Sequence, residues 1–325
     1  MGQNILFRGY TSEGHRIHRK VPFKPTMFVP SQKGESDWVA LDGTKVEPVT
    51  FANIPEAEEF KANYSDVSNF KVYGNHNYVA QFIAEEYPDN INFDSKLIDV
   101  GNIDIEVASD DGFPHPDTAN YPVISIAYKS SRENVYYVWG LGDYDPTIAE
   151  IDTRGALTKY YKCEDEKQLL QRFVGWWSEH TPDIITGWNI RLFDIPYLIN
   201  RTEKVCGTKT TKHYSPWGIY KHRQIAIKGK SLDAYEIYGV SQVDYYDLFQ
   251  KFGYSFGTQE SYSLDHISHV VLGESKLSYE EHGNLFKLLT SKSRNITVDA
   301  AKPKENMANF EKWCLLRDRI KSKIS

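Results

Sequence analysis

The chain has 325 residues, of which 40% are hydrophobic and 14% aromatic, so it is long enough for about two domains with a sizeable core. Its net charge of −6 does not by itself favour a nucleic-acid partner, and it has no run of about 18 apolar residues that would span a membrane. The three cysteines, Cys163, Cys206 and Cys314, contain no C-x-x-C pair. Their spacing excludes a cysteine-based zinc site and indicates a reducing compartment.

The first hundred residues predict a small α+β domain of short strands, turns and a helix. Strands are expected at residues 4–11 and 25–31, and residues 71–88 begin as a strand and become helical. This region shows no pattern of side chains with recognisable chemistry.

From Ser95 onward the pattern changes to alternating strands and helices. Three strands in succession predict an antiparallel meander, and they are followed by a helix, a buried strand and a second helix, at residues 102–108, 123–130, 134–141, 164–180, 182–189 and 193–207. This order predicts an α/β fold, a mixed sheet with flanking helices that is compatible with an RNase H-like domain.

Two alternating stretches around "KGK" predict a projecting β-hairpin near residues 212–240, followed by helix-like patterns at 243–253 and 263–273. Residues 290–325 are polar and basic, with one helix expected at 306–323. From Lys287 to the end there are ten Lys or Arg and four Asp or Glu. This charge is typical of a solvated face or loose tail, and it also suits contact with nucleic acid.

Asp104 and Glu106 alternate with Ile103, Ile105 and Val107, so the two carboxylates share one face of a strand. Side chains two positions apart on a strand can reach one divalent ion, and two carboxylates so placed require a cation, a proton or water between them. The alternative is the exposed polar face of an edge strand.

Asp194 stands between Phe193 and Ile195, just before Pro196, at the expected start of a helix. Aspartate is a preferred helix N-cap, so capping is one explanation for it. With the strand carboxylates it makes a set of oxygen ligands suited to Mg²⁺ or Mn²⁺. A pair of such ions can activate a water for phosphodiester cleavage.

Two segments, "NIDIEVASDDGFPHPDTANYPVISIAY" and "DIITGWNIRLFDIPYLINR", resemble the first and second exonuclease motifs of family B DNA polymerases. The version is that of T-even-like bacteriophages and their cyanobacterial relatives, and the resemblance covers about residues 1–289. It implies an N-terminal polymerase domain over 1–100, an RNase H-like 3′→5′ proofreading exonuclease domain over 101–289, and a divergent basic tail over 290–325.

The resemblance also implies roles for individual residues. Asp104, Glu106 and Asp194 would be the catalytic metal ligands of a two-metal Mg²⁺ or Mn²⁺ site. The DNA-binding residues would be those that hold or stack on the 3′ end, Phe113, Asn189 and Phe193, and those of the strand-separating hairpin, Arg223, Lys228 and Lys230. Single-stranded or primer-template DNA is the expected substrate.

The third exonuclease motif, Tyr-x-x-x-Asp, has no recognisable match, because Tyr279 is followed four residues later by Gly283. The polymerase signature Asp-Thr-Asp is absent as well. We therefore expect an exonuclease part of a split or truncated phage polymerase that makes no DNA alone. A second chain would carry palm, fingers and thumb and reach a sliding clamp. The alternative is a non-catalytic DNA-binding scaffold or a defective remnant. The expected location is the cytoplasm of the infected bacterial host.

Overall fold

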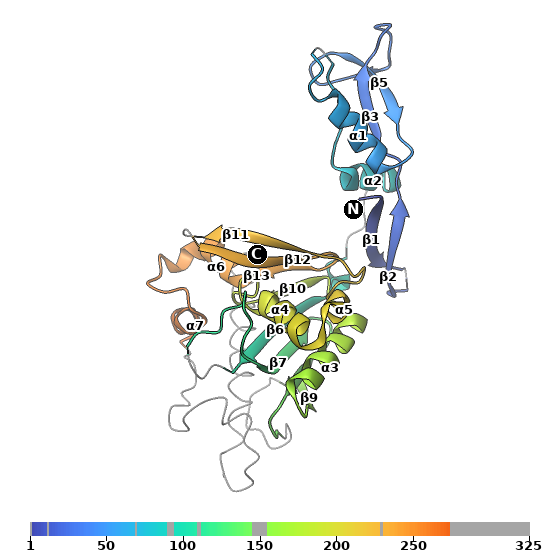
Figure 1. Cartoon of the computed structure of the whole chain (residues 1–325). Coiled ribbons are helices and arrows are strands. Elements are labelled where there is room, and N and C mark those ends of the chain that lie inside the picture. The colour runs from blue at the N-terminus through green and yellow to red at the C-terminus, as the bar shows by residue number, and fades with distance from the viewer. Residues whose placement is uncertain are drawn as a thin grey trace. The chain divides into compact units, whose positions relative to one another are not determined.

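The computed structural model describes residues 2–11, 13–68, 70–89, 94–108, 112–144, 155–227 and 230–273, without the side chains of Ile227 and Lys230. Contacts divide the chain into two compact units, residues 1–97 and the part that begins at Ile98 (Figure 1). The basic tail at 290–325 and its expected helix lie outside the described residues.

The first unit contains two small antiparallel sheets. The first sheet pairs β1 with β2, and the second has the order β3-β5-β4. The five strands are β1 Asn4–Tyr10, β2 Arg16–Pro22, β3 Thr26–Pro30, β4 Trp38–Val39 and β5 Lys45–Thr50. The strands expected at 4–11 and 25–31 are confirmed as β1 and β3.

Two helices complete this unit, α1 Ile54–Tyr64 and α2 Tyr78–Glu86. Each begins at an asparagine whose side chain accepts backbone N–H groups of the first turn: Asn53 accepts from Glu56, and Asn77 accepts from Val79 and Ala80. The strand expected before α2 is reduced to a single bridge between Phe28 and Tyr73.

The second unit is built on a six-stranded mixed sheet with the order β13-β10-β6-β7-β8-β9. Its strands are β6 Val100–Val107, β7 Val123–Ser130, β8 Val135–Gly140, β9 Leu157–Lys162, β10 Ile184–Gly187 and β13 Ser241–Asp244. The strands β6, β7 and β8 pair antiparallel, which confirms the expected meander. The pairs β8–β9, β6–β10 and β10–β13 are parallel.

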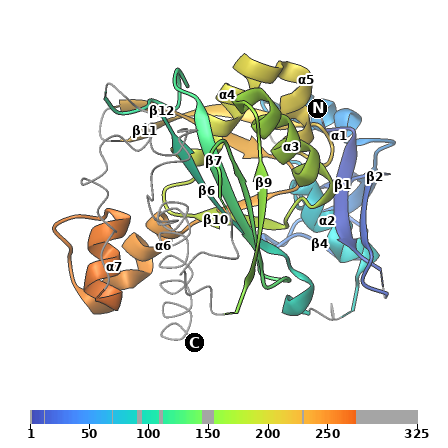
Figure 2. The ribbon, with the colours of Figure 1, turned by 90° about the horizontal axis from the view of Figure 1, so that it is seen from below.

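Helices cover both faces of this sheet. One face packs against α3 Glu166–Glu179 and α4 Asp194–Cys206, which is followed by the short α5 Thr208–Thr211. The other face packs against α6 Tyr245–Phe252 and α7 Leu264–Leu272. Figure 2 shows the two groups of helices on opposite sides of the strands. The expected α/β, RNase H-like fold class is confirmed.

The expected hairpin is present as β11 Tyr220–Ile227 and β12 Lys230–Ile237, which pair antiparallel and form a sheet of their own. Two strands of the main sheet were not expected, β9 and β13. The expected helix-like segment at 243–253 instead starts within β13, and α6 begins after Asp244. Four-residue strands leave too short an alternation to be distinguished from the start of a helix.

No helix among the described residues is long and apolar enough to cross a membrane.

Candidate functional site

Strand β6 places its side chains as the alternation predicts. Ile103 and Ile105 are buried in the core beneath α3 and α4, whereas Asp104 and Glu106 are only partly buried. The pairing with β10 covers only Val100 to Asn102, so β6 continues past the end of β10 at the carboxylates. A register shift against β7 lies directly after Glu106, and such bulges are common next to functional sites.

Asp194 lies against this free edge of β6. Its Oδ1 accepts the backbone N–H of Ile105 at 3.2 Å, from the residue between Asp104 and Glu106. Asp194 is the first residue of α4, and the N-cap position belongs to Phe193, which makes no side-chain capping bond. The structure therefore contradicts the capping explanation for Asp194, because its carboxylate hydrogen-bonds to the strand.

The electrostatic surroundings of Asp194 are unfavourable to a negative charge. The residue is 4% exposed, and burial raises the pKa of its carboxyl well above the ordinary range. The negative charges of Asp244 and Glu106 raise this pKa further, while the N–H of Ile105 lowers it. A buried carboxylate with acidic neighbours is the kind of group that a divalent cation stabilises.

The described residues contain no group of three or more His, Cys, Asp or Glu side chains close enough together to hold a metal ion. The donor chemistry nevertheless fits Mg²⁺ or Mn²⁺, because the available atoms are carboxylate oxygens from a strand and a helix start. Asp104 and Glu106 each take part in further interactions within the protein.

Two of the expected DNA-binding aromatic residues lie together. The ring centroids of Phe113 and Phe193 are 5.6 Å apart, and Phe193 directly precedes Asp194. Phe113 is 68% exposed, an unusual environment for a phenylalanine. This exposure places the ring at the surface, in contact with the residue that precedes Asp194. Asn189 begins the turn that leads to Phe193, and its backbone has a left-handed φ of 65°.

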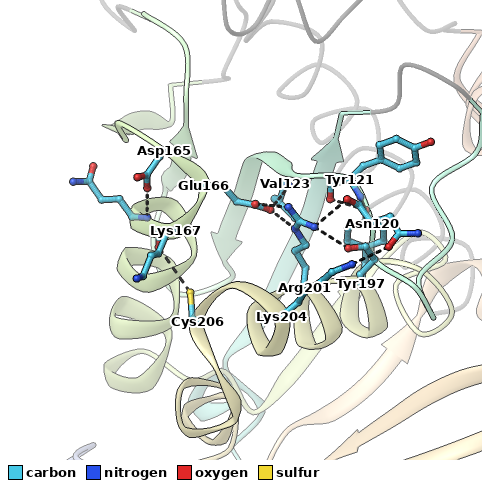
Figure 3. A network of polar contacts seen from close by, with 12 residues as sticks. Asn120, Tyr121, Val123, Asp165, Glu166, Lys167, Tyr197, Arg201, Lys204 and Cys206 are labelled. Carbon is cyan, nitrogen blue, oxygen red and sulfur yellow. Dashed lines mark hydrogen bonds and ion pairs between the residues drawn. The ribbon is translucent and has the colours of Figure 1, made fainter.

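The loop that follows Phe113 is tied to α3 and α4 by a polar network (Figure 3). Arg201 donates two hydrogen bonds of 2.7 Å to the two oxygens of Glu166, and each side chain is only 12% exposed. Arg201 also donates to the backbone oxygens of Ala119 and Asn120 at 3.0 and 3.1 Å. Tyr197 Oη donates to the oxygen of Tyr121 at 2.8 Å. The helix that starts at the carboxylate site therefore also holds the loop.

The hairpin residues have a different environment. Arg223 forms an ion pair with Glu236 across the two strands, and the side chains are 55% and 47% exposed. His222 Nε2 lies 2.7 Å from Asp233 Oδ1, within hydrogen-bond distance. Lys228 and the side chain of Lys230 lie outside the described residues.

Asp244 is a residue of this region that the sequence did not single out. It is 5% exposed, ends β13, and accepts backbone N–H groups of the turn that carries Asn189. The helix-like pattern of residues 243–253 conceals that Asp244 ends a strand parallel to β10. The four residues of β13 contain a single apolar side chain, Val243, so the local sequence carried no clear strand signal.

Comparisons with known proteins agree with the geometry. The family model described as "DNA polymerase family B, exonuclease domain" matches residues 39–267. The DNA-directed DNA polymerase of Escherichia phage RB69 is 31% identical over 310 residues, which cover 90% of this chain and 34% of the relative. That of Enterobacteria phage T4 is 30% identical over 298 residues, which cover 86% and 33%.

A more distant relative, the DNA polymerase delta catalytic subunit of Drosophila melanogaster, is 30% identical over 138 residues, or 41% of this chain and 11% of the relative. The chain spans about a third of the length of the phage relatives. The resemblance carried by the two motif segments is confirmed. The chain belongs to DNA polymerase family B and contains its exonuclease domain.

Proposed function

We propose that this chain is a 3′→5′ DNA exonuclease that removes nucleotides from single-stranded 3′ ends as a proofreading module. One observation carries the proposal: the Asp194 carboxylate is hydrogen-bonded to the strand between Asp104 and Glu106, although the two segments are 89 residues apart in sequence. Packing alone does not require a buried acid at the free edge of a strand that already has two carboxylates.

Asp104, Glu106 and Asp194 would hold the divalent ions, Mg²⁺ or Mn²⁺. When bound, these ions would supply an activated water and stabilise the leaving oxygen. The water oxygen bonds to the terminal phosphorus, the bond to the 3′ oxygen of the preceding nucleotide breaks, and a nucleoside 5′-monophosphate leaves. Burial of Asp194 keeps water away from one side of the group and strengthens its electrostatic interactions.

Phe113 and Phe193 would receive the bases of the unpaired 3′ end, with Asn189 beside them. The exposed ring of Phe113 supports this role, because base stacking on aromatic rings is sequence-tolerant and stabilises binding by about 1–3 kcal/mol per base. Tolerance of any base is what a proofreading site requires.

The hairpin β11–β12 would help to part primer from template in primer-template DNA. Arg223, Lys228 and Lys230 would meet phosphates along it. For Arg223 the contact requires exchange of its present partner, Glu236, for a phosphate. The half-exposed position of this pair keeps the cost of such an exchange low.

We propose that the domain boundaries follow the sequence interpretation, with an N-terminal domain over 1–100 and the exonuclease domain over 101–289. DNA synthesis would depend on palm, fingers and thumb supplied by a second polymerase chain. A sliding clamp would be reached through that chain, in the cytoplasm of an infected bacterium.

A second candidate function is DNA binding without cleavage. It is favoured by the mismatch to the third motif, Tyr-x-x-x-Asp. Four residues after Tyr279, where the motif has an aspartate, stands Gly283. A two-metal site that lacks one carboxylate retains the surfaces that bind DNA but holds its ions more weakly.

One assay separates the two functions. The full chain is mixed with a 5′-labelled single-stranded oligonucleotide in Mg²⁺ or Mn²⁺, alone and with a polymerase partner chain, and the products are resolved by length. The exonuclease proposal expects a ladder that shortens from the 3′ end, and chelation with EDTA stops it. Filter binding of the same oligonucleotide measures affinity without cleavage.

Asp104→Ala and Asp194→Ala are expected to abolish the ladder while leaving oligonucleotide binding in place. The matched control is Asp143→Ala, an exposed aspartate that pairs with Lys162 away from β6, and it should cleave normally. If the chain binds the oligonucleotide but shortens it in no condition, the function is DNA binding without cleavage. If Asp104→Ala cleaves as well as the wild type, the catalytic site lies elsewhere.

A further inference from the structure

The turn that carries the second motif begins where two parallel strands end side by side. Strand β10 ends at Gly187, which pairs in register with Asp244 at the end of β13. The side chain of Asp244 is therefore next to the backbone that leaves β10. In parallel sheets the functional groups gather at these carboxyl ends.

Asp244 uses both carboxylate oxygens to hold backbone. Its Oδ1 accepts the N–H of Asn189 at 2.8 Å and that of Tyr246 at 2.9 Å, and its Oδ2 accepts the N–H of Arg191 at 3.0 Å. The bond from Tyr246 caps α6, whereas the other two belong to the turn after β10. Charge-assisted hydrogen bonds of this kind are about twice as strong as neutral ones.

The turn has an uncommon conformation that these contacts hold in place. Asn189 has a φ of 65°, in the left-handed region where asparagine is among the few residues other than glycine that occur with any frequency. The carbonyl of Asn189 accepts the N–H of Phe193 at 3.0 Å, and that of Ile190 accepts the N–H of Ile195 at 2.9 Å. The conformation set at Asn189 is thereby carried directly to Asp194 at the start of α4.

Two further contacts from the same side of the sheet hold this turn. Arg191 forms an ion pair of 2.9 Å with Asp247 on α6. Trp188 Nε1 donates to the backbone oxygen of Tyr262 at 3.2 Å. Together with Asp244, they join the turn to β13, α6 and the segment before α7.

We propose that Asp244 is a positioning residue for the nuclease site: it fixes the turn that sets where Asn189, Phe193 and Asp194 lie. The inference rests on the proposed function for its catalytic consequence. Asp244 does not serve as a further metal ligand, because three backbone N–H groups already occupy its oxygens. It acts through the turn and touches neither DNA nor metal.

The test compares Asp244→Asn with Asp165→Asn in the full chain. Both aspartates are helix N-caps, and Asp165 caps α3 by accepting the N–H of Gln168 on its Oδ1 at 2.8 Å. Asparagine caps helices as well as aspartate does, so both variants keep their helix. At position 244 the new NH₂ group faces an N–H of the turn, where an acceptor is required.

Two measurements are made on each variant. Hydrogen exchange followed by mass spectrometry reports on a peptide that contains residues 188–194, without reference to activity. Cleavage of a 5′-labelled oligonucleotide is measured against Mn²⁺ concentration. We expect Asp244→Asn to speed exchange in this peptide and to raise the Mn²⁺ concentration for half-maximal rate by about 10–100-fold. Asp165→Asn should change neither.

Unchanged exchange in Asp244→Asn would overturn the proposal, and so would faster exchange with an unaltered Mn²⁺ dependence. A wild-type chain that cleaves nothing would refute the proposed function. In that case the exchange comparison still decides whether Asp244 holds the turn, since it requires no turnover.

Discussion

Helix α4 carries two buried charged sites with opposite character. At its start, Asp194 is 4% exposed, and the charged side chains that act on it are the acids Glu106 and Asp244. Two turns later, Arg201 meets Glu166 in a two-bond ion pair whose oxygen also accepts the N–H of Val123. The ion pair balances its own charge, whereas the acids Glu106 and Asp244 raise the pKa of Asp194.

The difference agrees with a structural role for Arg201 and with the proposed metal-binding role of Asp194. A buried ion pair with all its hydrogen bonds made holds parts of the chain in place, as Arg201 does for the loop after Phe113. Like charges held together disfavour the folded state, and a protein retains them where a ligand supplies the opposite charge. Substitutions at each site test this contrast between the Arg201 ion pair and the acids at Asp194.

Arg201→Ala should lower the free energy of unfolding by about 3–5 kcal/mol, because it leaves Glu166 buried without its partner. Urea denaturation followed by circular dichroism measures the change. The double variant Glu166→Gln, Arg201→Met is the control and should lose less, since neither charge remains. If Arg201→Ala lowers the free energy of unfolding by less than about 1 kcal/mol, the ion pair between Arg201 and Glu166 does not have the structural role assigned to it.

Phe113→Ala asks whether the loop held by Arg201 serves the carboxylate site. We expect weaker binding of a single-stranded oligonucleotide by about 1–3 kcal/mol, from the lost stacking, and little change in stability because the ring is exposed. Fluorescence anisotropy measures the affinity. Tyr254→Ala, another exposed ring, is the matched control. Equal affinity in wild type and Phe113→Ala would separate the loop from DNA binding.

Asp194→Asn should raise the free energy of unfolding by about 1 kcal/mol while abolishing metal-dependent cleavage. The amide keeps an oxygen for the N–H of Ile105 and replaces a carboxyl whose ionised form is disfavoured by burial and by the acids Asp244 and Glu106. Thermal unfolding without divalent ions and the ladder assay give the two readouts. A destabilised Asp194→Asn would mean that the charge itself supports the fold.

Arg223→Ala should change the free energy of unfolding by less than about 0.5 kcal/mol, because its pair with Glu236 is about half exposed. This variant is the baseline for the buried pair, measured in the same urea titration. If Arg223 contacts a phosphate, the Arg223→Ala variant should bind primer-template DNA more weakly, and its affinity should depend less on salt concentration. If Arg223→Ala loses as much stability as Arg201→Ala, burial does not explain the difference between the two ion pairs.

Much of the second unit was predictable because its elements have clear periodicity. The alternation at Ile103, Ile105 and Val107 indicated β6, and the apolar face of residues 164–180 indicated α3. Strand β9 was missed since its residues are only partly buried or exposed, without a continuous apolar face. Strand β13 was missed because four residues before a helix carry too little pattern.

The sequence by itself determined the family, the two motif segments and the face that Asp104 and Glu106 share, because these depend on residue order and on the period of a strand. Only the tertiary structure showed that the carboxylate of Asp194 accepts the N–H of Ile105. It also showed that Asp244 accepts backbone N–H groups of the turn that precedes Asp194. Both contacts join residues more than 50 positions apart in sequence. They arise because parallel strands bring distant carboxyl ends together, and no local pattern records which strands become neighbours.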